Sequence, residues 1–448
     1  MTGTAALSKA SNGMPSVFLG LLDIVGFYGC LHRGLKEIGC RSYHLHLGGE
    51  KAGKWSYDEM PLMLRIFYDS YKRFHESRSY SKYNLARYWH SALFIFFRSL
   101  LVLWALIFVD IFFFKSGESL FVSKVDQRIF RLFGKKVIHM YHGSDERPPY
   151  LRPGNGEDAV RLLGLAQQIK KSLEESAAVS DVVISNPLSS HFQSGRCCIA
   201  QVLGNSVDSV KLGSGKNLAA DAVRNEGFCR ILHAPSTPHL KGSDRIRDAI
   251  ATLKKRGHKI DYVEITGLPN EQVMKELALC DLVVDELYSD DYGALFSVEA
   301  MAFGRPAIVC GYGKDELDRF VPKDVAAPTL YTTPDLLIES LEKLVSDENF
   351  RNECGKSAYN FSREFSWANL QAKRFLQIAQ GKAPEQWFFE PKDVRYAAGV
   401  AAPEDVIARQ IKMVVEKFGP AGLLLDDKPE LRDTLIEFTS VKAGNLAA

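Results

Sequence analysis

The feature that most constrains the fold is an alternation of short apolar segments with longer helical segments, which occurs twice along the 448-residue chain. Short apolar runs bounded by turn residues are typical of buried strands, and strands that alternate with helices are typical of parallel sheets. The first series begins at an expected strand 16–22 and the second at 229–234, with the polar stretch 204–225 between them. We therefore predict an α/β chain with two Rossmann-like, doubly wound domains.

The expected domains are 1–215 and 216–380, followed by a helical tail at 381–448, with 204–225 as the hinge. In the first domain we expect strands at 16–22, 42–47, 109–114, 136–141, 181–185 and 199–203, and helices at 30–39, 89–106 and 161–176. In the second we expect strands at 229–234, 260–266, 282–286 and 307–310, and helices at 243–256, 270–279, 296–303, 333–346 and 349–364. The tail shows helical patterns at 403–418 and 429–438.

The most apolar segment of the chain, 91–114, is about long enough to span a bilayer. Arg98 and Asp110 interrupt it, and the uninterrupted run 99–109 is only about half the length that a spanning helix needs. Two interpretations stay open, membrane insertion and a buried helix 89–106 that runs into a buried strand. We favour the buried helix, because strands covered on both faces also have continuous apolar sequences.

Charge divides the chain into a basic and an acidic half. Residues 1–220 carry 27 Lys and Arg against 18 Asp and Glu, a net charge of +9, whereas the remainder carries a net charge of −7. The basic half would suit anionic lipid or a phosphorylated acceptor, or it is an ordinary solvated surface.

The eight cysteines show no metal-binding spacing and the N-terminal sequence has no apolar signal region, so we expect a cytoplasmic protein with reduced cysteines.

The loop 234–242 follows an expected strand and opens an expected helix. Its backbone N–H groups and the helix N-terminus would hold a phosphate, with side-chain donors from Ser236, Thr237 and Lys241 beside Gly242. A solvated lysine and a simple helix cap would give the same local sequence. In open parallel sheets, however, ligands bind beyond the carboxyl ends of the strands, where this loop is expected to lie.

The segment 291–299 places Asp291 in a glycine-containing loop and Glu299 inside an apolar helix. A carboxylate on a buried helix is unfavourable unless it is paired or bound to ligand hydroxyls, and sugar hydroxyls are suitable partners. A structural ion pair for Glu299 and a helix cap for Asp291 are the alternatives. Ligands of open parallel sheets bind beyond the carboxyl ends of the strands. We therefore assign phosphate contacts to Gly293, Ala294 and Leu295, and nucleotide contacts to Gly267 and Leu268.

Two further loops are expected at the mouth of the first domain. His142, Asp145 and Arg147 follow the strand 136–141 and supply an imidazole, a carboxylate and a guanidinium, although a turn with Asp145 as helix N-cap is an equally simple explanation. The other loop carries Gly26, Tyr28 and Gly29. Its glycines would let an acceptor or the donor phosphates approach the backbone closely. We assign acceptor binding to Tyr28, Asp145 and Arg147.

Taken together, these residues resemble the retaining glycosyltransferases of the GT-B fold, in the large family (glycosyltransferase family 4, group 1) that includes sucrose synthases, phosphatidylinositol mannosyltransferases and many bacterial polysaccharide enzymes. The resemblance covers about 16–380. It is strongest where Lys241-Gly242 matches the family's phosphate-binding pair and where 299–306, EAMAFGRP, matches its "EAMAxGxPV" helix. Asp291 stands where the family usually has the first Glu of its E-x7-E pair, and Ser236 stands where many members carry Arg.

The resemblance implies a nucleoside-diphosphate sugar as donor and a glycan or lipid-linked acceptor, with retention of configuration and without a cofactor or an obligatory metal. Lys241 would contact the diphosphate, Glu299 the ribose hydroxyls and Asp291 the transferred sugar, and His142 would lie near the reacting sugar. A role in bacterial surface polysaccharide synthesis follows from the resemblance, with peripheral contact to the inner face of the cytoplasmic membrane through the basic half and no nucleic-acid partner. The alternative is a catalytically weak sugar-nucleotide-binding or scaffolding protein with the same fold.

Overall fold

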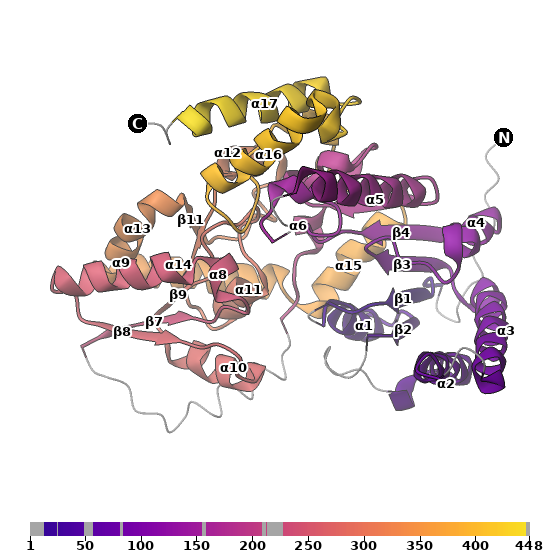
Figure 1. Ribbon diagram of the computed structural model, residues 1–448. Helices are drawn as coiled ribbons and strands as arrows, with labels where there is room; N and C mark the ends of the chain where they lie inside the picture. The colour runs from indigo at the N-terminus through magenta and orange to yellow at the C-terminus, as the bar shows by residue number, and fades with distance from the viewer. Residues whose placement is uncertain are drawn as a thin grey trace. The chain divides into compact units, whose positions relative to one another are not determined.

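The computed structural model describes residues 13–24, 26–48, 57–80, 84–154, 158–207, 212 and 227–444. The chain divides into two compact units (Figure 1). Unit 1 comprises Met1–Tyr141, Ser172–Ile184 and Ala372–Ala383, and unit 2 comprises His142–Lys171, Ser185–Gln371 and Pro384–Ala448. The predicted boundary at 215/216 and most of the predicted hinge 204–225 lie outside the described residues.

Unit 1 is built on a parallel sheet whose strands lie in the order β2, β1, β3, β4 and β5. Their bounds are β1 Val17–Leu21, β2 Ser42–His46, β3 Ile111–Lys115, β4 Lys136–Met140 and β5 Val182–Ser185. The helices with residues in this unit are α1 (Phe27–Glu37), α2 (Leu62–Ser77), α3 (Leu85–Phe108), α4 (Val125–Leu132), α5 (Ala159–Ala177) and α15 (Ala368–Ala379). Phenylalanines form much of its core, and the Phe112 and Phe130 rings stack with centroids 3.8 Å apart.

The helix expected at 89–106 is present as α3, but the prediction that it is buried is wrong. Only 17% of its most apolar window is buried, and by length and composition it is the one helix among the described residues that could cross a membrane. Its inner side, formed by Leu101, Val102 and Ala105, packs into the core of unit 1. The two charges that interrupt the run also lie on the inside, because Arg98 stacks over Phe94 and Phe121, and Asp110 is fully buried.

Unit 2 contains a second parallel sheet, with strands in the order β11, β10, β9, β7 and β8. Neighbouring residues of β7 point to opposite faces: Ile231 joins a core cluster with α9 and α13, whereas Leu232 joins one with α10 and α11. Helices therefore cover both faces, and the predicted doubly wound α/β class is confirmed for this unit. The strand bounds are β7 Cys229–His233, β8 Ile260–Glu264, β9 Leu282–Val284, β10 Ala307–Cys310 and β11 Leu330–Thr332. The helix bounds are α8 Pro238–Lys241, α9 Ser243–Lys255, α10 Asn270–Leu279, α11 Leu295–Ala302, α12 Lys314–Phe320, α13 Leu337–Ser346 and α14 Glu348–Phe365.

The remainder of unit 2 joins segments that are far apart in sequence. The predicted strand 199–203 is wrong in its bounds: the strand is β6 (Cys197–Ile199), which pairs with β12 (Phe388–Phe389) in antiparallel fashion, and a short helix, α6 (Ala200–Leu203), follows it. The tail helices are α16 (Glu404–Phe418) and α17 (Pro429–Gly444). The Tyr150 hydroxyl donates to the Leu423 carbonyl at 2.8 Å and the Lys428 ammonium to the His191 carbonyl at 2.7 Å. The tail is thus an integral part of unit 2.

Candidate functional site

The loop between β7 and α9 presents the predicted phosphate-binding residues at the carboxyl end of the unit 2 sheet. Ser236 is exposed and Thr237 is half-buried, and the short helix α8 then places Lys241 directly before α9. Gly242 adopts φ 73°, and a Cβ built on it would lie 2.7 Å from Cδ1 of Leu287. The glycine is therefore required, both by the left-handed turn and by the close approach of the loop after β9.

Lys241 lies against two carboxylates that follow β9. Its ammonium pairs with Glu286, and a carboxylate oxygen of Asp285 lies 4.0 Å away. Burial lowers the pKa of Lys241, but Glu286 and Asp285 raise it further, so that the net change is upward. The lysine is therefore protonated at neutral pH. A bound diphosphate would compete with Glu286 for this ammonium.

His233, the last residue of β7, stabilises the base of the loop. Its Nδ1 lies 2.8 Å from the Val284 carbonyl and its Nε2 lies 2.7 Å from the hydroxyl of Ser243, the first residue of α9. A carbonyl only accepts, so Nδ1 carries the proton and Nε2 accepts from the hydroxyl. Burial lowers the pKa of His233, which agrees with a neutral ring. The histidine thereby links β7, β9 and the start of α9.

The helix α11 holds Glu299 at a site that is only 6% exposed. The loop before α11 packs tightly against its first turns, because a Cβ on Gly293 would lie 2.7 Å from Cβ of Ser297. The Ser297 hydroxyl in turn donates to Asp285 at 2.6 Å. Ala294 and Leu295 begin the helix and are half-buried. The hydrogen bond between Ser297 and Asp285 therefore links the helix that carries Glu299 to the acidic pair next to Lys241.

Asp291 accepts a hydrogen bond from the Tyr292 N–H at 2.7 Å. Burial raises its pKa to about 6, against a smaller lowering effect of Gln201 and the Tyr292 N–H. Gly267 and Leu268 lie in the loop after β8, where Gly267 has φ 71° and Leu268 is 56% exposed. These two residues are available to a ligand at the same end of the sheet.

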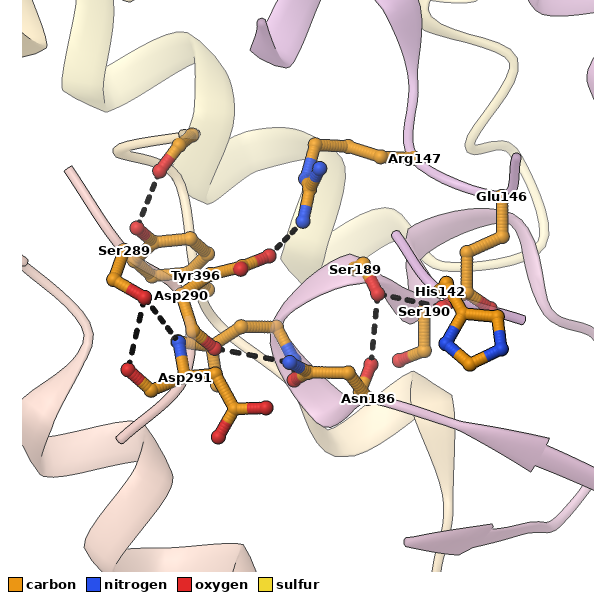
Figure 2. Close-up of polar contacts among 12 residues, drawn as sticks. His142, Glu146, Arg147, Asn186, Ser189, Ser190, Ser289, Asp290, Asp291 and Tyr396 are labelled. Carbon is orange, nitrogen blue, oxygen red and sulfur yellow. Dashed lines mark hydrogen bonds and ion pairs between the residues drawn. The ribbon is translucent and has the colours of Figure 1, made fainter. Parts of the chain in front are cut away.

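The turn 142–147 contacts the loop that carries Asp291, and both lie within unit 2 (Figure 2). Arg147 is buried and forms an ion pair with Asp290, whose carbonyl also accepts from the Asn186 amide at 3.0 Å. The Asp145 carboxylate accepts from the His142 N–H at 2.9 Å, while the His142 ring is exposed. Arg147 therefore already has a carboxylate partner inside unit 2, whereas His142 faces outward.

Glu146 occupies the centre of a buried polar network beside this turn (Figure 2). It accepts hydrogen bonds from Ser185 at 2.7 Å, from Ser189 at 2.5 Å and from Gln193 at 2.8 Å. Burial and the neighbouring Asp145 raise its pKa to about 7, although the three donors oppose this rise. The network fixes the turn to the segment after β5.

The predicted residues Gly26, Tyr28 and Gly29 lie in unit 1, at the start of α1. The Asp23 carboxylate accepts from the N–H groups of Tyr28 and Gly29 at 2.9 and 3.0 Å, and the Tyr28 hydroxyl donates to the Phe113 carbonyl at 3.0 Å. Asp23 thus occupies the helix N-terminus at which a phosphate was predicted. The roles assigned to these three residues stay predictions.

Within unit 2 the structure brings Lys241 to the loop that precedes Asp291 and Glu299. Sequence reasoning missed the residues that complete this arrangement, above all Asp285, Glu286 and Asp290. One signal was present, since the pair Asp285-Glu286 follows directly on the apolar strand β9, where buried carboxylates need partners. Among the described residues, no group of three or more His, Cys, Asp and Glu side chains is arranged to hold a metal ion.

Comparison with known proteins gives similarity at the level of structure. No family model and no curated protein sequence matches the chain. Among solved structures, a glycosyltransferase from Rickettsia africae is similar with a TM-score of 0.49 and 11% identity, over 82% of this chain and 98% of the other. The Anabaena protein HepE in complex with UDP-glucose gives 0.45 and 12%, over 82% and 100% of the two chains. A putative UDP-N-acetylglucosamine 2-epimerase from Listeria monocytogenes gives 0.40 and 10%, over 82% and 96%. Likeness at this level assigns no function.

Proposed function

We propose that the chain is a glycosyltransferase that binds a nucleoside-diphosphate sugar at the carboxyl end of the unit 2 sheet. The observation that carries this proposal is the juxtaposition of a protonated lysine with carboxylates held by the loop before α11. Lys241 supplies the charge that a diphosphate requires, while Glu299 and Asp291 offer acceptors for hydroxyl groups. The resemblance of the Lys241-Gly242 pair and of the EAMAFGRP helix to those of the GT-B enzymes supports the same assignment.

In the proposed reaction the bond between the anomeric carbon and the diphosphate oxygen breaks, and a bond from the acceptor oxygen to that carbon forms. The acceptor proton passes to the departing diphosphate, and attack on the same face retains the anomeric configuration. Lys241, Ser236, Thr237 and the start of α9 stabilise the negative charge that develops on the leaving group. This electrostatic contribution requires no obligatory metal, and no protein nucleophile is needed.

The proposed acceptor is a glycan or a lipid-linked sugar of bacterial surface polysaccharide synthesis. His142 has an exposed ring and lies on the turn beside the Asp290–Asp291 loop, which favours a place near the reacting sugar. Asp145, which orients the His142 main chain, is the proposed positioning residue. A lipid-linked acceptor would place the enzyme at the inner face of the cytoplasmic membrane.

One observation favours a second candidate, a sugar-nucleotide-binding protein with weak or no turnover. Lys241 is already neutralised by Glu286 and Asp285, so the phosphate site carries less positive charge than the lysine alone would give. Such a site could retain a nucleotide sugar without stabilising a departing diphosphate. Turnover distinguishes the two candidates, since both predict binding.

The test begins with a thermal-shift screen against UDP-, GDP-, ADP- and CMP-linked sugars, because a ligand that binds only the folded state raises the melting temperature. Hydrolysis and transfer of the sugar that binds are then measured for the wild type and for Lys241→Ala and Glu299→Ala. The enzyme is supported if both variants stay folded and lose activity. Tight binding without turnover on any acceptor would favour the scaffold, and a screen in which no sugar nucleotide binds would refute both.

A further inference from the structure

The outer side of α3 carries an unusual density of exposed apolar side chains. Leu85, Trp89, Phe96, Leu103 and Ile107 are spaced by four or seven residues, which places them along one stripe that runs the length of the helix, and Ile95 lies at the edge of this stripe. Each of them is more than half exposed: Leu85, Trp89, Ile95, Phe96, Leu103 and Ile107. Large contiguous apolar surfaces on a folded protein mark interaction sites.

The same helix is anchored in unit 1 along its opposite side, so it is a part of the fold rather than a free segment. Leu101, Val102 and Ala105 lie in the core, and α2 packs along α3 (Figure 1). Arg98 is held on this inner side by the Phe94 and Phe121 rings, and its charge therefore does not interrupt the outer stripe. Because one side of the helix is fixed in the core, only its outer stripe can reach a membrane. This suits a helix that lies parallel to the membrane surface rather than one that crosses it.

Basic residues are concentrated on the second half of α2 and in the segment that leads into α3. Residues 72–87 contain five Lys and Arg against one Glu, a net charge of +4. Lys72 and Arg73 of α2 and Arg78, which directly follows this helix, are exposed, and Arg73 lines a cavity of about 180 Å³ together with His90 and Phe97 of α3. Arg73 therefore lies beside Phe97, whose ring contacts that of Phe96 in the stripe with the ring centroids 5.3 Å apart. An apolar stripe with a basic border is complementary to anionic lipid, and Trp89 at this end has the amphipathic ring typical of the membrane interface.

We propose that the outer stripe of α3 binds the surface of an anionic lipid bilayer, with its apolar side chains inserted between the headgroups and with Lys72, Arg73 and Arg78 beside the lipid phosphates. This surface belongs to unit 1 and does not depend on the donor site of unit 2. Membrane binding and sugar-nucleotide binding are therefore measured separately.

The test is sedimentation of the purified full-length protein with vesicles of phosphatidylcholine alone and of phosphatidylcholine mixed with phosphatidylglycerol. The wild type is expected to bind the mixed vesicles more strongly, and added salt should weaken this binding. The double variant Phe96→Glu and Leu103→Glu is expected to lower the partition coefficient roughly tenfold or more, because each change removes an inserted apolar side chain. The matched control Leu336→Glu and Val160→Glu changes residues of similar exposure and should bind as the wild type does.

Circular dichroism and the urea unfolding midpoint establish that both double variants are folded, which is expected because all four residues are exposed. Failure of the wild type to bind either kind of vesicle would overturn the proposal, as would unchanged binding by the α3 variant. Self-association of the wild type without lipid, lost in the α3 variant, would assign the stripe to a second copy of the chain instead. Protein that resists extraction from membranes by alkaline carbonate would show that α3 spans the bilayer and would also refute the proposal.

Discussion

Replacement of Lys241 by Met removes the ammonium of the proposed phosphate site and keeps most of the side-chain volume. A hydrogen bond to a charged group contributes about 1.5–3 kcal/mol, which corresponds to roughly 10- to 150-fold in the dissociation constant. The structure places the expected effect at the upper end of this range. Without the lysine, Glu286 and Asp285 would face the diphosphate without their cation. Two like charges about 6 Å apart repel by roughly 3 kcal/mol at an effective dielectric constant of 20, before salt screening.

We therefore expect Lys241→Met to raise the dissociation constant of the nucleotide sugar about 100-fold in isothermal titration calorimetry. A second change, Glu286→Gln, should recover about tenfold of this loss, because it removes one of the carboxylates that repel the ligand. The control is Lys255→Met, at the exposed far end of α9. A dissociation constant for Lys241→Met within about twofold of the wild-type value would refute the proposed phosphate contact. Further weakening by Glu286→Gln would show instead that Glu286 binds the ligand directly.

Three further perturbations test the framework around this site. Gly242→Ala should lower stability by about 1–3 kcal/mol in urea unfolding, because its φ is 73° and its new Cβ would meet Leu287; an unchanged midpoint would contradict this. Arg147→Met leaves the buried Asp290 without its partner and should cost about 3–5 kcal/mol, whereas a loss below about 1 kcal/mol would argue against the ion pair. The pKa of Asp291 is raised to about 6 in the folded state, so its contribution to stability is present at low pH and is lost as the pH rises through 6. Asp291→Asn should therefore flatten the decline in unfolding free energy between about pH 4 and 7, and an identical pH profile would exclude this titration.

The hydrophobic periodicity of the sequence was sufficient to predict most strands of the two sheets and most of the helices that connect them. The helix at 270–279 begins and ends as predicted, and Pro269, which directly precedes it, is a local signal for its start. Burial of α3 could not be predicted in this way. Arg98 and Asp110 suggested a soluble core helix, yet both point inward, and only tertiary packing determines which side of a helix faces the core.

For the candidate site, residue types at strand ends identified the right loops but not the pairing between them. Lys241 and Glu286 are 45 residues apart, and their contact depends on β7 and β9 lying next to each other in the sheet. The same holds for Arg147 and Asp290, which come together only because the turn after β4 belongs to unit 2. Sheet order is set by long-range packing, which local patterns in one sequence do not encode.

The measurement that tests the central claim most directly is a calorimetric comparison of ribo- and 2′,3′-dideoxyribonucleoside diphosphates, titrated into the wild type and into Glu299→Gln. If the buried carboxylate of Glu299 accepts the ribose hydroxyls, the wild type should prefer the ribonucleotide by roughly tenfold or more, and the variant should lose this preference. An equal preference in both proteins would contradict the assignment of Glu299. Absence of binding by any nucleoside diphosphate to the wild type would contradict the proposed donor site altogether.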